Sequence, residues 1–210
     1  MSKTIAILQS NYIPWKGYFD LIAAVDEFVI LDSVQFTKND WRNRNRIGTP
    51  RGPLWLTIPI RTSGRLSQRI SEAEAADASW AKRHWQTIAQ HYARAPRFQQ
   101  YGEELREVYA QAACEPRLSH INKMFLDLIC RWLGIDTLIT SSEKYPDHPY
   151  RVDRLIGICQ AAQACRYLTG PKAQAYLDPD RFAAAGIGVE FFAYRDYGAQ
   201  PLSAIDSVLN

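Results

Sequence analysis

Residues 5–8 read Ile-Ala-Ile-Leu, and this short run decides the fold class. A continuous apolar run of this length, with β-branched members, is typical of a strand that is buried on both faces. Residues 28–31 read Phe-Val-Ile-Leu and repeat the pattern. The stretch between them predicts a helix over residues 14–25, since Pro14 is favoured in a first helical turn. A strand, a helix and a second strand in this order indicate an α/β protein.

The rest of the chain continues this alternation around a helical block. Further strands are predicted at residues 54–60, 138–140, 166–168 and 189–193, and further helices at 79–93, 100–114, 119–133, 152–164 and 178–185. Gly134 directly follows the third of these helices, as expected of a C-terminal glycine. We predict a single α/β domain over residues 1–210, with an open, mostly parallel sheet covered by helices. Residues 79–133 form a helical insertion or cap within it.

Bulk composition narrows the class of protein. The chain has 210 residues, of which 47% are hydrophobic and 22% charged, as in an ordinary globular protein. Its net charge of +3 is too small for a global nucleic-acid footprint, and its apolar runs are too short for a signal peptide or a membrane span. We therefore expect a cytoplasmic protein with reduced thiols and with no nucleic-acid or membrane partner.

Residues 38–51 carry the strongest functional signal. These 14 positions hold five basic residues against one acid, Asp40, and asparagines alternate with the arginines. The basic residues are Lys38, Arg42, Arg44, Arg46 and Arg51, and aromatic residues are interleaved at Phe36, Trp41 and Trp55. Guanidinium groups pair bidentately with phosphate and carboxylate, so the segment predicts a loop that grips an anionic or polyhydroxylated ligand. A solvated loop and a nonspecific nucleic-acid patch are the alternatives.

Polar residues follow three of the predicted strands. Ligands of open parallel sheets bind at the carboxyl ends of strands, so we expect these loops to converge on one edge. The residues are Gln9, Asn11, Tyr12 and Trp15 after the first strand, Asp32 and Gln35 after the second, and Thr169, Gly170 and Lys172 after a late one. We predict that the arginine-rich segment, the first connection and the tip of the second strand surround a common hollow.

Several of these residues also have ordinary structural explanations. Asp32 could equally cap a turn, and Gly170 could be a simple turn residue. The aromatic side chains of Trp15 and Tyr18 are equally typical of a hydrophobic core. His84 and His91 share one helix face and are more typical of packing or surface residues than of ligands. His148 lies in a loop and is an acid–base candidate.

Sequence motifs for other chemistries are absent. The chain has no His-Glu-x-x-His, Cys-x-x-Cys, Gly-x-Gly-x-x-Gly, Walker or Gly-x-Ser-x-Gly sequence, so we predict no metal site and no tightly bound cofactor. Cys130 and Cys159 lie in apolar helical stretches, and burial disfavours a reactive thiolate. Cys159 and Cys165 are therefore only weak nucleophile candidates.

Several segments together resemble the WbqC-like family over nearly the whole chain. They are residues 9–19, 32–36, 41–47, 55–59, 92–98, 167–170, 176–178 and 202–206, and Trp41-Arg-Asn-Arg-Asn-Arg46 is the most specific. The family usually has proline where this chain has Ser10, and His-Pro where it has Arg195 and Asp196.

This resemblance implies an enzyme of amino-sugar biosynthesis. Its implied activity is amide formation, in which an aminoacyl group such as glycyl moves to the amine of an amino sugar. The acyl group would arrive as a thioester on the phosphopantetheine of an acyl or peptidyl carrier protein. The predicted partners are this carrier and a small amino-sugar or sugar-nucleotide substrate.

Roles for individual residues follow from this chemistry. Asp32 is the candidate base, and Gln9, Asn43 and Asn45 offer amides to an oxyanion. Arg44 and Arg46 suit a phosphopantetheine phosphate or a sugar-nucleotide pyrophosphate. The remaining predicted substrate-binding residues are Tyr12, Trp15, Tyr18, Gln35, Trp41, Thr169, Gly170 and Lys172.

A nucleotidyltransferase-like enzyme acting on a sugar phosphate is one alternative function, although both histidines of the usual His-x-Gly-His element are absent near Pro14. A noncatalytic binding module for a carrier or sugar nucleotide is the other.

Overall fold

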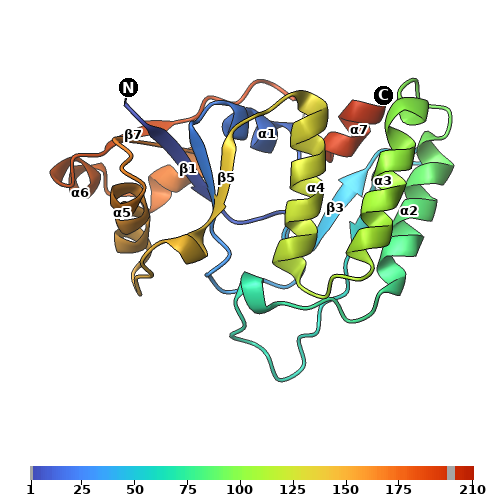
Figure 1. Cartoon of the computed structure of the whole chain (residues 1–210), viewed down its shortest axis with the longest axis horizontal. Helices are drawn as coiled ribbons and strands as arrows, with labels where there is room; N and C mark the ends of the chain where they lie inside the picture. The colour runs from blue at the N-terminus through green and yellow to red at the C-terminus, as the bar shows by residue number, and fades with distance from the viewer. Residues whose placement is uncertain (1, 198–201) are drawn as a thin grey trace. The chain divides into compact units, whose positions relative to one another are not determined.

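The computed structural model describes residues 2–197 and 202–210, and the chain divides into two compact units. Unit 1 comprises Met1–Gln9, Gly17–Ser33 and Ile135–Asp196. Unit 2 comprises Ser10–Lys16, Val34–Gly134 and Tyr197–Asn210. The helices predicted at 79–133 fall within unit 2, together with the arginine-rich segment (Figure 1).

Unit 1 is built on a five-stranded sheet with the order β5-β2-β1-β6-β7. Its strands are β1 (Thr4–Leu8), β2 (Glu27–Ile30), β5 (Leu138–Ser141), β6 (Arg166–Thr169) and β7 (Gly188–Phe191). Each neighbouring pair is parallel, which confirms the predicted α/β class. The run at 5–8 forms the central strand, as its continuous apolar character predicts.

Helices cover both faces of this sheet. The helices of unit 1 are α1 (Lys16–Ala23), α5 (Arg151–Ala161) and α6 (Pro179–Ala184), with short 3₁₀ turns at η2 (Ser142–Lys144) and η3 (Pro171–Ala175). Ile7 and Val29 pack in one buried cluster with Phe182 of α6 and with α5. Successive strand residues face opposite sides, so Phe28 lies on the other face, where its ring is 5.3 Å from Tyr18 of α1.

The order of the strands reverses within the sheet. The chain passes from β1 to β2 and β5 on one side, and then returns to β6 and β7 on the other side of β1. In doubly wound sheets, ligands bind outside the carboxyl ends of the strands at such a switch point. The switch point here lies between β1 and β6.

Unit 2 contains an antiparallel hairpin that the sequence analysis did not predict. Its strands are β3 (Arg44–Ile47) and β4 (Leu54–Thr57), with Arg44 opposite Thr57 and Arg46 opposite Trp55. The expectation of an arginine-rich loop is therefore wrong for residues 44–47. The predicted strand at 54–60 exists in part as β4, but it pairs with β3 in a separate two-stranded sheet and not with the parallel sheet of unit 1.

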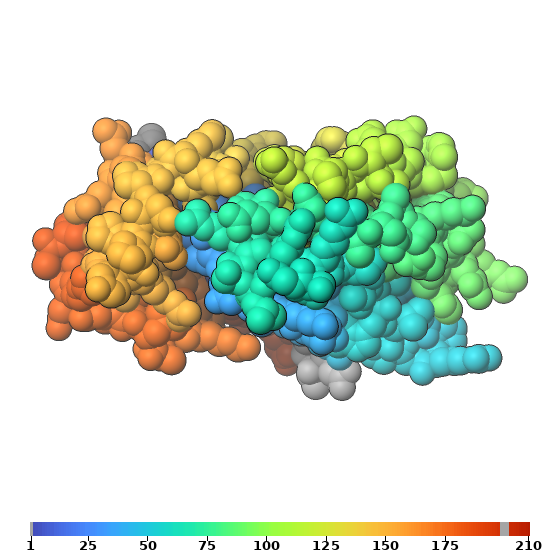
Figure 2. Space-filling model, turned by 90° about the horizontal axis from the view of Figure 1, so that it is seen from below, coloured from blue at the N-terminus to red at the C-terminus, as the bar shows by residue number. Residues whose placement is uncertain are grey.

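Helices complete unit 2. They are η1 (Ile70–Glu72), α2 (Ser79–Tyr92), α3 (Phe98–Ala112), α4 (Leu118–Leu133) and α7 (Ala204–Leu209). The predicted glycine stop of α4 is confirmed, because Gly134 has φ +65° and terminates the helix in a left-handed conformation. Figure 2 shows the connection between β4 and α2 (teal) beside residues 34–40 (blue), and Phe36 N donates to the Gln68 carbonyl over 2.9 Å.

Among the described residues, no helix is both long and apolar enough to cross a membrane.

Candidate functional site

The carboxyl edge of the unit 1 sheet gathers polar side chains from adjacent strands. Gln9 directly follows β1, Asp32 lies two residues beyond β2, and Thr169 ends β6. Asp32 and Thr169 are only 4% and 2% exposed. Because β2, β1 and β6 are parallel neighbours, these three residues share one edge, as predicted from the sequence.

Hydroxyl groups and a glycine lie at the same edge. Ser142, which directly follows β5, donates from Oγ to Ser33 Oγ over 3.3 Å. Tyr167 donates from its hydroxyl to Thr169 Oγ1, also over 3.3 Å. Gly170 directly precedes η3, and a Cβ at this position would lie 3.2 Å from the Tyr194 hydroxyl, so the backbone and that ring approach closely.

Lys172 adds a cation beyond β6. It lies exposed on η3, on the carboxyl side of the strand. A flexible ammonium at this position suits an anionic ligand, whereas the buried hydroxyl of Thr169 suits a neutral group. The edge therefore combines a carboxylate, hydroxyls and a mobile positive charge.

Tyr18 and Trp15 have the structural roles that the sequence analysis left open. Tyr18 is 3% exposed and donates from its hydroxyl to the Gln9 carbonyl over 2.9 Å, so it shapes the first connection from the core. Trp15 forms an antiparallel bridge with Ser203 in unit 2, and its ring lies edge-on to Tyr197 at 5.4 Å. Neither observation tests substrate binding.

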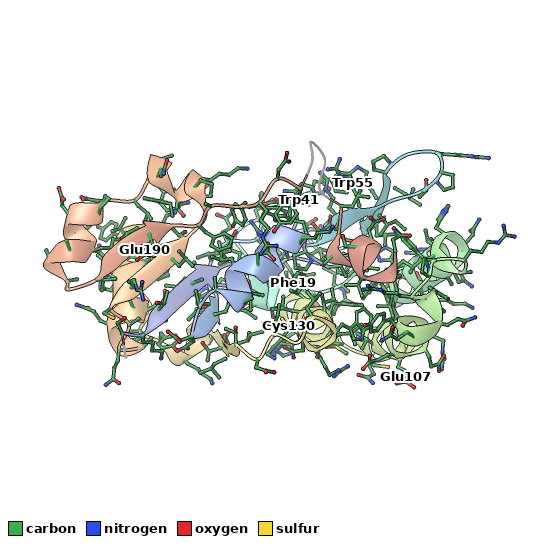
Figure 3. All side chains as sticks on the ribbon, turned by 90° about the horizontal axis from the view of Figure 1, so that it is seen from above. Phe19, Trp41, Trp55, Glu107, Cys130 and Glu190 are labelled. Atoms are coloured by element: carbon green, nitrogen blue, oxygen red, sulfur yellow. The ribbon has the colours of Figure 1, made fainter. Side chains whose placement is uncertain are left out.

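Unit 2 presents four side chains that we call the arginine–tryptophan surface: Trp41, Arg44, Arg46 and Trp55 (Figure 3 labels both tryptophans). The indole centroids are 5.5 Å apart and tilted by 32°. The Arg44 guanidinium lies 4.3 Å from the Trp55 centroid. The Arg46 guanidinium lies 5.7 Å from the Trp41 centroid and 5.3 Å from that of Trp55. The guanidinium groups of Arg44 and Arg46 thus lie over the indole rings of Trp41 and Trp55.

The hairpin register explains why these side chains meet. Residues 44 and 46 lie on the same face of β3, since side chains alternate along a strand. Trp55 stands directly opposite Arg46 on β4. Trp55 is absent from the residues predicted to bind substrate, because only the cross-strand pairing brings it beside the arginines.

Arg42 and Arg44 differ in whether a carboxylate lies near the guanidinium group. Arg42 lies 3.5 Å from Asp40 and also donates to the side-chain oxygen of Asn11. Arg44 has no carboxylate partner among residues 2–197 and 202–210, and its buried Nε has no hydrogen-bond acceptor there. The positive charge of Arg44 is therefore left for a ligand or solvent to neutralise.

The asparagines of the segment anchor the hairpin from behind. Asn45 is 2% exposed and donates from Nδ2 to the carbonyls of Tyr12 (3.2 Å) and Ile13 (2.8 Å). Its Oδ1 accepts from Arg46 N over 2.8 Å. Asn43 donates from Nδ2 to the Ile58 carbonyl over 2.9 Å. The arginine-rich segment thus contacts the first connection through Asn45, while the predicted common hollow and a catalytic role for these amides stay predictions.

Gln35 also contacts the backbone of unit 2. Its Nε2 donates to the Leu66 carbonyl over 2.9 Å, and the residue forms an antiparallel bridge with Arg69. These contacts hold the segment that leads into the hairpin. A role for Gln35 in binding substrate stays a prediction.

Tyr12 lies in the core of unit 2, so its expected position on a ligand-facing surface is wrong. It is 0% exposed, and its ring packs edge-on against Trp80 (6.0 Å) and Phe125 (5.5 Å). Its hydroxyl shares hydrogen bonds with His84 Nδ1 (2.9 Å) and with the Tyr109 hydroxyl (2.7 Å). The buried ring has no free face for a sugar.

His84 makes the stability of unit 2 sensitive to acid. Burial lowers its pKa from 6.5 to about 4, and the ring also hydrogen-bonds the backbone of Thr57. The unfolded chain binds a proton at higher pH than the folded one, so stability falls between pH 6.5 and 4 by up to about 3 kcal/mol. Urea unfolding of the protein and of His84→Gln across this range measures the difference, and identical pH slopes for the two proteins would contradict it.

The cysteines differ sharply in environment. Cys159 is 0% exposed in α5, and burial raises its pKa to about 12, so its thiol stays protonated at neutral pH. Cys130 is likewise buried, and burial raises its pKa to about 12. Cys165 immediately precedes β6, at the amino end of the strand and thus at the opposite sheet edge from Thr169. All four cysteines are free.

His148 lies exposed between η2 and α5. Its backbone N donates to Asp147 Oδ1 over 2.9 Å, and that carboxylate also accepts from Arg154. The contacts describe an ordered turn before α5, and acid–base function for His148 stays a prediction.

These features define an α/β protein with a doubly wound parallel sheet and a second unit that carries an exposed cation–aromatic hairpin. The chain belongs to the WbqC-like protein family, which it matches over residues 9–210, so the predicted resemblance is confirmed. It is similar to a Mycobacterium tuberculosis protein described as uncharacterized, with 42% identity over 217 residues that cover 99% of this chain and 94% of the relative. No solved structure matches the chain.

Proposed function

We propose that the protein is an amide-forming acyltransferase that moves an aminoacyl group from a carrier-protein thioester to the amine of an amino sugar. The observation that carries this proposal is the buried Asp32 carboxylate at the carboxyl edge of the sheet. It lies one strand from the switch point that Gln9 and Thr169 flank. Family membership supports the same assignment through the resemblance described above.

The proposed reaction is direct aminolysis. The amine nitrogen attacks the thioester carbonyl carbon, the C–N bond forms, and the C–S bond breaks. Asp32 accepts the proton that the amine loses, and the departing thiolate then takes up a proton. A thioester is already activated, so the reaction needs no nucleoside triphosphate to activate the acyl group. The absence of a Walker sequence agrees with this.

The hydroxyl-rich edge supports binding of the acceptor. Sugars are recognised through hydrogen bonds, and Thr169, Ser142 and Ser33 supply hydroxyl groups at the same sheet edge as Asp32. Gln9 supplies an amide that suits the developing oxyanion. Lys172 offers a charge for an anionic portion of a substrate.

A covalent route through cysteine is less well supported. The Cys159 thiol is buried and has a strongly raised pKa, and Cys165 lies at the other end of its strand. A nucleophilic thiol needs an exposed site that favours the thiolate. Direct attack by the amine avoids this requirement.

The test is a reconstituted transfer reaction. The purified protein is incubated with a carrier protein loaded with glycyl or another aminoacyl thioester and with a panel of amino sugars. We expect release of the carrier thiol together with a new amide, detected by mass spectrometry. Reactions without protein or without the amine measure background hydrolysis.

Other products would point to the alternative functions. Pyrophosphate release from a nucleoside triphosphate and a sugar phosphate would favour a nucleotidyltransferase. Tight binding of carrier or sugar nucleotide without any product would favour a binding module. Absence of amide across the whole panel would count against the transferase proposal.

A further inference from the structure

We propose that the arginine–tryptophan surface binds a nucleoside diphosphate, with the diphosphate on Arg44 and Arg46 and the base on the indole rings. This inference goes beyond the proposed function and does not depend on it. The binding of the nucleoside diphosphate itself can be measured without any transfer reaction.

The charge of the surface fits a diphosphate. Arg44 and Arg46 extend from the same face of β3 and both stack on Trp55. Two guanidinium groups at one place favour a ligand with adjacent ionised phosphates, because each fork can take two oxygens. Arg44 has no carboxylate partner in the described parts of the chain, so a phosphate that arrives at Arg44 displaces no ion pair of that residue.

The exposed rings fit a base. Trp41 and Trp55 are 41% and 43% exposed, although indole side chains are usually well buried. An aromatic side chain that stacks on a nucleobase contributes about 1–3 kcal/mol.

The combination discriminates between two phosphate-bearing ligands. A phosphopantetheine arm carries a single phosphodiester and has no aromatic ring, so it would use only part of the surface. A nucleoside diphosphate has both an aromatic base and adjacent phosphates, and it would use all four side chains. The surface therefore fits a nucleoside diphosphate better than the phosphopantetheine arm of a carrier.

The surface is also organised before a ligand arrives. Guanidinium planes that lie on indole rings lose less side-chain freedom on binding than free arginines do. Asn45 fixes the rear of β3 to two backbone carbonyls, which holds the strand in place. A pair of guanidinium groups that is already positioned binds a diphosphate with a smaller loss of conformational entropy than two mobile side chains would.

The experiment is a titration of the purified protein with UDP, ADP, GDP and dTDP, followed by tryptophan fluorescence and calorimetry. We expect at least one of them to bind about tenfold more tightly than its nucleoside, than inorganic pyrophosphate and than phosphopantetheine. The bound base should change the emission of Trp41 and Trp55.

Matched variants locate the site. Arg44→Gln and Trp55→Leu should each weaken binding about tenfold or more, whereas Arg51→Gln, which removes the same charge from the hairpin tip, should change it less than about twofold. Trp41→Leu provides a second ring variant if Trp55→Leu lowers the thermal unfolding midpoint. Equal losses from Arg44→Gln and Arg51→Gln would show general charge attraction and overturn the proposal.

Other outcomes are equally decisive. Failure of every nucleoside diphosphate to bind below about 1 mM, or equal affinity for pyrophosphate alone, would overturn the proposal. Tighter binding of a single-stranded oligonucleotide would assign the surface to nucleic acid instead. Binding without amide formation would contradict only the transferase, and amide formation without nucleotide binding would contradict only this inference.

Discussion

Replacing Asp32 with asparagine is expected to lower the rate of amide formation by roughly 100-fold, since general bases contribute on the order of 10²–10⁴. The substitution keeps the size of the side chain and removes its ability to take a proton. The affinity for the amino sugar should change little, so the loss should fall on kcat. Initial rates at varied amine concentration, measured as carrier thiol released, separate the two parameters.

Asp136→Asn is the matched control for this experiment. Asp136 is an exposed carboxylate in unit 1 and precedes β5, at the amino end of the strand. We expect this variant to keep the full rate. A full rate in Asp32→Asn, with circular dichroism unchanged, would remove Asp32 from the mechanism.

Replacing Asn45 with alanine is expected to destabilise unit 2 by about 4 kcal/mol. The change removes the hydrogen bonds to the buried Tyr12 and Ile13 carbonyls and the one from Arg46 N. Each such loss costs about 1–3 kcal/mol. Urea unfolding monitored by tryptophan fluorescence gives the difference in unfolding free energy.

Thr57→Ala on the same hairpin provides the comparison. Thr57 is exposed on β4, and its side chain has no hydrogen bond among the described residues. A surface change of this kind should alter stability by less than about 0.5 kcal/mol. A loss below about 1 kcal/mol for Asn45→Ala would mean that the hairpin does not depend on this amide.

Strong apolar patterns allowed most of the fold to be predicted. The runs at 5–8 and 28–31 correctly predicted β1 and β2, and the glycine after residue 133 correctly ended α4. β3 was not predicted because Arg44-Asn-Arg-Ile47 lacks the usual alternation of apolar and polar residues, although its side chains alternate between half-exposed and buried. The buried residues are Asn45 and Ile47, and the burial of polar Asn45 depends on partners in the first connection.

The candidate site was only partly predictable for a related reason. The carboxyl-edge position of Asp32 and Thr169 follows from strand ends, which a sequence reveals. Whether an aromatic ring faces a ligand or a core depends on distant residues, and Tyr12 is buried by Trp80, Tyr109 and Phe125. The pairing of Trp55 with Arg46 required the register of the hairpin.

The route of the chain between β2 and β5 has a consequence for biosynthesis. These strands are parallel neighbours, yet Val34–Gly134 of unit 2 separates them in sequence. On the ribosome, β2 emerges long before its partner, so one of its hydrogen-bonding edges stays open while the intervening residues are made. An open edge invites pairing with other chains. Newly made chains that stall within this interval should therefore be the ones that recruit chaperones or aggregate.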